Sequence, residues 1–131
     1  MTTLTYQYIL IYYLYFATIL KFLKLGVAMD IFLNTIGAVN DATRVEILHF
    51  INTNGEVCVC DIENSFSMIQ SRISRHLKIL KDAGFLKVER RGRWAYYSVR
   101  TPMDEFRQSI LKEIGCLDIK IPLLNKGCKS E

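Results

Sequence analysis

Cys58 and Cys60, two cysteines separated by one residue, are the side chains whose type and spacing most clearly suggest chemistry. Thiolates bind soft metal ions, whereas hard ions such as Mg²⁺ prefer carboxylates. On a regular helix, residues two apart point about 200° away from each other, so both thiols reach one ion only if the helix unwinds locally or Cys58 precedes it. We expect a soft-metal site at this pair, with Cys116 or Cys128 as a third ligand. The alternative is that Cys58 is a small buried apolar residue and Cys60 is incidental.

A second candidate site is a cluster of positive charge. The 131 residues include 17 Lys and Arg and 13 Asp and Glu, but residues 71–100 alone contain nine of the basic residues and only two acids. Such a local excess is typical of a surface that binds a polyanion. Because charge counting alone would favour an ordinary solvated surface, the geometry of the elements that carry these side chains must decide.

Most of this charge lies on a predicted helix. Ser67 and Gln70 fit a capping box, which predicts a helix over residues 68–82 with Gly84 just beyond its end. The helix should bury a narrow apolar stripe, and its other side should offer hydroxyls and cations to a partner. The residues of the predicted stripe are Ile69, Ile73, Leu77 and Leu80.

The polar side of this helix has the composition of a DNA-reading surface. Arg and Gln side chains can make paired hydrogen bonds to guanine and adenine edges in the major groove. The residues of this helix predicted to contact DNA are Gln70, Ser71, Arg72, Ser74, Arg75, His76 and Lys78.

A predicted hairpin follows the helix directly. Residues 85–90 and 94–100 are rich in β-branched and aromatic side chains, and Arg91-Gly92 between them indicates a tight turn. A basic hairpin after a basic-faced helix is the outline of a winged helix-turn-helix, a mainly α fold with a small β-hairpin wing. In that fold the helix enters the major groove and the wing contacts phosphates or the minor groove. The predicted wing contacts are Arg90, Arg91 and Arg93.

The other predicted helices complete the domain. Asp41 is a good N-cap for the second of them, and Asn54-Gly55 is a good stop. The last helix carries an apolar stripe that suggests a dimer interface, with packing on its own core as the alternative. We therefore expect a homodimer that forms through the first and last helices. The predicted helices are residues 31–39, 41–54, 58–65 and 103–115, and the last stripe is Met103, Phe106, Ile110 and Ile114.

Residues 1–28 have a different composition from the rest of the chain. Residues 2–20 carry no charged side chain, and Lys21 and Lys24 follow them. Three interpretations stay open: translation that starts at Met29, a single marginal membrane span within residues 1–24, and an extra packing or dimerising helix. A secretory signal fits poorly, because the basic residues follow the apolar run instead of preceding it.

The order of these motifs resembles the ArsR-type family of winged-helix metalloregulatory repressors. The likeness covers about residues 40–99 and, more loosely, residues 103–115. It implies a cytoplasmic, homodimeric repressor of operator DNA, and not an enzyme. From the composition of the chain we expect an apolar leader at 1–28, a DNA-binding domain at 29–115 and a flexible tail at 116–131. The segments that carry the likeness are DATRVEIL, GEVCVCDI and QSRISRHLKILKDAGFLKVERRGRWAYYSV.

The stretch around the cysteine pair is similar to the arsenic-sensing branch of that family. The resemblance implies that As(III) or Sb(III) binds Cys58 and Cys60 and releases the protein from DNA, with Cd(II), Zn(II) or Pb(II) as lesser alternatives. The branch has a third cysteine where this sequence has Glu63, which is a departure from the pattern. Four cysteines in a DNA-binding chain indicate free thiols in a reducing compartment. Two other functions stay open: a membrane-tethered metal-responsive regulator, and a thiol-redox protein that uses the cysteine pair.

Overall fold

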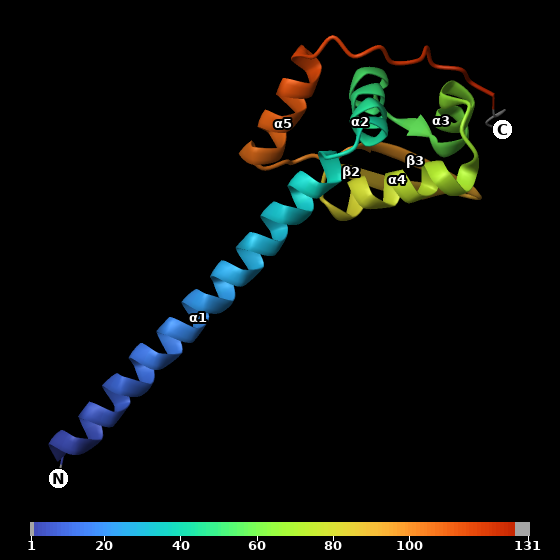
Figure 1. The fold of residues 1–131 in the computed structure, drawn as a ribbon. Coiled ribbons are helices and arrows are strands. Elements are labelled where there is room, and N and C mark those ends of the chain that lie inside the picture. Colours follow the sequence, from blue (N-terminus) through green and yellow to red (C-terminus); the bar gives the residue numbers. More distant parts are fainter. Residues whose placement is uncertain (1, 128–131) are drawn as a thin grey trace. The chain divides into compact units, whose positions relative to one another are not determined.

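The computed structural model describes residues 2–127 of the chain, which divides into two compact units at Asn34 and Thr35 (Figure 1). The first unit consists of most of α1 (Thr2–Val39), and its large apolar side chains are exposed. Among the described residues, no helix combines the length and apolarity that crossing a membrane requires. The last residues of α1, from Thr35 onward, belong to the second unit, which contains every other element.

The second unit is a winged helix-turn-helix, as the sequence predicts. Three helices precede a β-hairpin, and one helix follows it. α3 contacts α4, and α4 contacts β2, so the helix pair and the wing form one connected body. The elements after α1 are α2 (Ala42–Asn54), β1 (Val57–Cys58), α3 (Val59–Phe66), α4 (Gln70–Asp82), β2 (Leu86–Arg91), β3 (Trp94–Val99) and α5 (Glu105–Cys116).

The predicted ends of α2 are confirmed. The Asp41 carboxylate accepts a hydrogen bond of 2.9 Å from the backbone N–H of Arg44, which satisfies one of the free N–H groups at the start of the helix. At the other end Gly55 adopts a φ of 77° and donates its N–H to the carbonyl of Ile51. This positive-φ conformation is open to glycine at little cost, so the helix stops there.

The predicted start of α4 is wrong. Ser67 does not cap α4; it ends α3 in the left-handed conformation, with φ 49° and ψ 44°, and Met68 donates its N–H back to Glu63. α4 begins at Gln70, so Ile69 lies before the helix and is 72% exposed instead of buried. Met68 and Ile69, which the capping-box pattern assigns to the helix, belong instead to the turn between α3 and α4.

A three-stranded antiparallel sheet in the order β1-β3-β2 forms the wing and its base. In the hairpin, Arg91 pairs with Trp94 across the turn, and Gly92 has a φ of 60°, as the sequence pattern predicts. No sequence pattern predicts β1. Its two residues pair with β3, Val57 with Tyr97 and Cys58 with Tyr96.

The core lies where α2, α4 and the base of the hairpin meet. α4 contributes Ile73, Leu77 and Leu80, three of the four residues of the predicted stripe, and all three are fully buried. Gly84, with a φ of 88°, turns the chain from α4 into β2. The core therefore fixes one side of α4 and leaves the opposite side to solvent. The other fully buried large residues are Thr35, Ile47, Leu48, Phe50, Ile51, Ile62, Phe85 and Leu86.

Candidate DNA-binding face and metal site

The solvent side of α4 carries the predicted DNA contacts. Six of the seven side chains are exposed, while His76 is half-buried. Lys78 forms an ion pair of 2.7 Å with Asp82 one turn further on, and this hydrogen bond raises the pKa of Lys78. The exposed residues are Gln70, Ser71, Arg72, Ser74, Arg75 and Lys78.

His76 differs from its neighbours on α4 because it lies at the border of the core. Burial lowers its pKa, Asp41 opposes that effect, and the nearby cations of Arg44, Arg72 and Arg75 add to it. Its buried Nδ1 has no hydrogen-bond partner within the part of the chain that the structure describes. The ring is therefore held mainly neutral near pH 7, and it can offer DNA a hydrogen bond but little charge.

The three wing arginines are in different environments. Arg91 donates to Glu56 at 2.9 Å and to Glu89 at 3.1 Å, and its guanidinium lies 4.5 Å from the centre of the Tyr96 ring. The guanidinium of Arg93 lies 5.3 Å from the Trp94 ring centre, and Arg90 is exposed on the same hairpin. Because two carboxylates offset the charge of Arg91, Arg90 and Arg93 are the wing cations with more charge to offer a phosphate.

Cys58 precedes α3 instead of lying on it. The residue is extended, with φ −70° and ψ 144°, and forms both the end of β1 and the N-cap of α3. Cys60 lies in the first turn of α3. The arrangement meets the condition that the spacing imposes, namely that Cys58 should come before the helix. That condition is therefore met without a break inside α3.

Cys60 is disulfide-bonded in this structure, whereas Cys58 is a buried free thiol and Cys116 an exposed one. The prediction of free thiols throughout is therefore wrong for Cys60. The reason is geometric, because a disulfide requires a second sulfur at bonding distance from Cys60. Cys60 can act as a thiolate ligand only after this bond is reduced.

A hollow of about 150 Å³ lies beside Cys58. Its lining includes Asp61 from α3 and the aromatic rings of Trp94 and Tyr96 from β3. Buried oxygens of Asp61 (Oδ1) and Glu63 (Oε1) have no hydrogen-bond partner within residues 2–127. A buried thiol next to an unsatisfied carboxylate oxygen is a polar site that a cation would stabilise.

The described residues show no third metal ligand beside the cysteine pair. Within residues 2–127, no group of three His, Cys, Asp or Glu side chains could hold a metal ion. Cys116 is exposed at the end of α5 and does not line the hollow beside Cys58. The other predicted third ligand, Cys128, lies outside the described residues.

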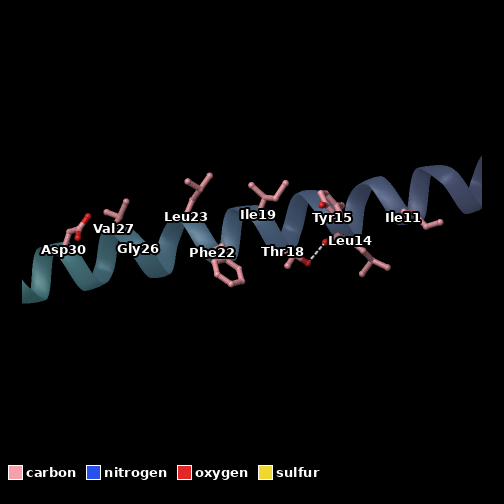
Figure 2. Close-up of a pocket in the computed structure, with 10 residues that line it drawn as sticks. All are labelled: Ile11, Leu14, Tyr15, Thr18, Ile19, Phe22, Leu23, Gly26, Val27 and Asp30. Carbon is pink, nitrogen blue, oxygen red and sulfur yellow. Dashed lines mark hydrogen bonds between the residues drawn. The ribbon is translucent and has the colours of Figure 1, made fainter.

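A larger surface depression, on α1, has no connection with this chemistry. Figure 2 shows that its side chains come from a single helix, and the hydrogen bond drawn there joins the Thr18 hydroxyl to the Leu14 carbonyl at 2.7 Å. One helix cannot enclose a ligand, and the lining includes one charged side chain, Asp30. We therefore assign it no ligand.

Comparison with known proteins identifies the family. The family model described as "Bacterial regulatory protein, arsR family" matches residues 41–88, which run from the cap of α2 into β2. The arsenical resistance operon repressor of Bacillus subtilis (strain 168) is 39% identical over 79 residues, which are 60% of this chain and 72% of that protein. This chain belongs to the ArsR family. The family is one of regulatory proteins that bind DNA, not of enzymes.

One further relative and one solved structure are similar to this ArsR-family chain. A cadmium resistance transcriptional regulatory protein CadC homolog of Staphylococcus aureus is 39% identical over 62 residues, 47% of this chain and 51% of that protein. Among solved structures, the homodimeric winged helix-turn-helix DNA-binding domain Mb0332 from Mycobacterium bovis is similar with a TM-score of 0.60 and 22% identity. The match covers 70% of this chain and 81% of that one. At that identity the likeness establishes the shared fold.

No sequence pattern predicts the residues that join the cysteine site to the wing. Glu56 bonds Arg91 on the hairpin, and Cys58 pairs with Tyr96 on β3. The only sequence signal for β1 is the β-branched pair Val57 and Val59, which is too short for a strand pattern. The contacts are visible only after the chain has folded, since 35 residues separate Glu56 from Arg91.

Proposed function

We propose that this ArsR-family chain is a homodimeric transcriptional repressor that leaves its operator when As(III) or Sb(III) binds at Cys58 and Cys60. The observation that carries the proposal is the position of Cys58. It lies at the junction of β1 and α3, directly before the helix pair whose second helix presents the basic face. This function places the protein in the cytoplasm, where bacterial operators lie.

The proposed DNA contacts are of two chemical kinds, with base edges and with phosphates. α4 enters the major groove, where Arg75, Gln70 and Ser71 reach base edges. The wing residues Arg90 and Arg93, together with Arg91, contact phosphates or the minor groove. Two copies related by a twofold axis then contact half-sites about one helical turn apart, roughly 34–36 Å. The homodimeric winged helix-turn-helix neighbour supports this assembly.

The choice of effector rests on the thiols and on the relatives. Soft thiolates favour soft ions, and the names of two relatives refer to arsenical and cadmium resistance. Arsenite and antimonite are the effectors that we propose, and Cd(II), Zn(II) and Pb(II) are weaker candidates. Cys58 and Cys60 bind the ion in the reduced protein, and the unpaired Asp61 oxygen beside Cys58 adds negative charge to the site.

The structure offers two physical routes from Cys58 to the DNA face. One runs along the chain, since α3 begins at Val59 and the turn into α4 follows its end. The other runs across the sheet, since Cys58 pairs with Tyr96 on β3 and Glu56 bonds Arg91 of the wing. Movement of Cys58 toward Cys60 would displace both α3 and the strand pair β1 and β3. The ion would therefore favour a form in which α4 and the wing fit DNA less well.

The test is a gel shift of the reduced full chain on the DNA upstream of its own gene, with arsenite, antimonite, cadmium, zinc and lead added separately. Arsenite and antimonite should release the wild-type protein. Cys58→Ser and Cys60→Ser should bind DNA normally and stay bound, while Cys116→Ser, a matched substitution of an exposed thiol, should behave as wild type. Release that survives both Cys58→Ser and Cys60→Ser would remove these thiols from the mechanism.

A further inference from the structure

One row of paired residues crosses the three-stranded sheet at the cysteine site. Cys58 on β1 pairs with Tyr96 on β3, and Tyr96 pairs in turn with Glu89 on β2. Directly paired residues of neighbouring strands point to the same face of a sheet, and so do residues two apart on one strand. Arg91 lies two residues after Glu89 on β2, so it shares this face with the Cys58 thiol and the Tyr96 ring. The face therefore reaches from the cysteine site to the turn of the hairpin.

Arg91 connects the two ends of that face. One of its guanidinium nitrogens lies 2.8 and 2.9 Å from the two oxygens of the Glu56 carboxylate, and the guanidinium lies 4.5 Å from the centre of the Tyr96 ring. Glu56 comes two residues before Cys58 in the chain. Glu56, Cys58 and Tyr96 all line the hollow beside the thiol. The side chains that hold Arg91 in place are therefore also part of the cysteine site.

Two carboxylates contact Arg91, but only one of them can transmit a movement of β1. Glu89, at 3.1 Å, lies on the same strand as Arg91, so this contact moves together with the hairpin. Glu56 directly precedes β1, so its ion pair with Arg91 joins the start of β1 to the wing. A shift of Cys58 along β1 therefore changes the Glu56 contact and leaves the Glu89 contact as it is.

We propose that the Glu56–Arg91 ion pair is a latch that holds the wing in the position that fits DNA, and that ion binding at Cys58 opens this latch. The proposal rests on the proposed function and assigns part of its coupling to one contact. Arg91 is then a positioning residue for the wing, in addition to its proposed contact with phosphates. An ion that draws Cys58 toward Cys60 also shifts Glu56, so the hairpin loses its tie to β1 and the DNA-binding form becomes less favourable.

The exposure of the pair limits how much the latch can contribute. The side chains of Arg91 and Glu56 are 49% and 37% exposed. Ion pairs at such exposed sites change an equilibrium by up to about fivefold. The latch can therefore account for a part of a coupling of about tenfold between ion and operator, while the route through α3 supplies the rest.

The experiment measures a coupling factor, which is the arsenite affinity of the free protein divided by that of the operator-bound protein. A phosphine first reduces the Cys60 disulfide of the full chain to thiols and is itself oxidised to the phosphine oxide. The protein is then titrated with arsenite, with and without saturating operator DNA, and ultraviolet absorbance of the As–S bonds reports binding. A direct effect of a substitution on ion binding cancels in this ratio, so the ratio reports the communication between the two sites.

Four single variants separate the latch from the charges around it. Glu56→Gln and Arg91→Gln each break the latch, and each should lower the coupling factor by about two- to fivefold. Glu89→Gln is the matched control for Glu56→Gln, because it removes the other carboxylate that contacts Arg91, and it should keep the wild-type factor. Arg90→Gln is the matched control for Arg91→Gln. It removes an exposed cation of the same hairpin, so it should weaken operator binding and keep the wild-type factor.

The double variant Glu56→Gln/Arg91→Gln shows whether the two residues act together. Substitutions on the two sides of one contact have non-additive effects, so the double variant should have the coupling factor of Arg91→Gln alone. The latch is overturned if the double variant loses the product of the two single effects, if Glu56→Gln keeps the wild-type factor, or if Glu89→Gln loses as much as Glu56→Gln. If the reduced wild type binds arsenite equally well with and without the operator, the proposed function fails and the latch fails with it.

Discussion

Arg107 of α5 ties together three parts of the second unit. Its guanidinium donates to the Ala83 carbonyl at 2.7 Å and to the Thr35 hydroxyl at 3.0 Å, and it forms an ion pair of 2.9 Å with Asp104. Thr35 is fully buried, and Ala83 is the C-cap of α4. One side chain therefore holds the end of α1, the end of α4 and the start of α5 in register.

Replacing this residue should destabilise the fold. Arg107→Met keeps the apolar stem but removes hydrogen bonds from a charged donor, so the free energy of unfolding in urea should fall by about 2–3 kcal/mol. Lys112→Met is the matched control, because Lys112 is an exposed cation of the same helix, and it should change the value by less than about 0.5 kcal/mol. Equal unfolding curves for the two variants would contradict the role of Arg107.

His76 should give the fold a dependence on mildly acidic pH. Burial lowers its pKa in the folded chain, so the unfolded chain binds more protons as the pH falls. The stability that this group contributes is complete above the unfolded pKa of about 6.5 and is lost as the pH drops from there through the folded pKa. The melting temperature of the wild type should therefore fall between pH 7.5 and pH 5 by more than that of His76→Gln. Parallel profiles for the two proteins would show that another group titrates.

The sequence indicates which side chains are candidates for the site, but it does not predict which residues they contact. Residue types and spacing indicate Cys58 and Arg91 as functional candidates, because a pair of thiols can bind a soft ion and a basic hairpin can contact phosphates. The carboxylate of Glu56 lies beside Arg91 because the fold brings together residues that are far apart along the chain. No local pattern carries that information.

At the scale of elements, α4 and the wing should make separable contributions to DNA binding. Arg75→Ala should cost about 1–3 kcal/mol on the operator and much less on unrelated DNA, because this side chain faces base edges in the proposal. Arg93→Ala should weaken binding to both DNAs and lower the slope of log affinity against log salt by about 1. Fluorescence anisotropy at several salt concentrations measures all of these quantities.

Arg100→Ala is the matched control for the wing. It removes an exposed cation just beyond β3, at the end of the hairpin opposite the turn, where Leu86 pairs with Val99. Its salt slope should equal that of the wild type. If Arg93→Ala instead lost only its preference for the operator, the assignment of base and phosphate contacts would be wrong.

The helix ends of this chain show which boundaries a local sequence pattern can predict. Asp41 and Gly55 bound α2 as predicted, because a side-chain cap and a glycine act through the few nearest backbone groups. Ser67 has the same capping chemistry, but it ends α3 because the turn must position α4 against the core. For a related reason no local pattern predicts β1, since its two residues form a strand only by pairing with β3.

At the scale of the whole molecule, dimerisation should depend on the exposed side of α5. An apolar hollow of about 340 Å³ is lined by Phe106 and Ile110 of α5 together with Val39 and Val45. Phe106 is 38% exposed, while Ile114 is buried in the core, so the predicted stripe divides between the surface and internal packing. Phe106→Glu should convert the dimer to a monomer in light scattering, with its melting temperature little changed. Lys112→Glu on the same helix should remain a dimer, and a dimeric Phe106→Glu protein would exclude this surface as the interface.

In the proposed function, ion binding at Cys58 and operator binding oppose each other. Coupling between two ligands is reciprocal, so the factor by which arsenite weakens operator binding must equal the factor by which the operator weakens arsenite binding. A coupling of about 1.4 kcal/mol or more corresponds to a tenfold change or more in each affinity.

The most direct measurement is the arsenite affinity of the reduced full chain, by As–S absorbance, with and without saturating operator DNA. We predict that the operator weakens arsenite binding about tenfold or more, and that unrelated DNA at the same concentration has a much smaller effect. The same arsenite affinity in the free and the operator-bound protein would contradict the account, even if both ligands bind tightly.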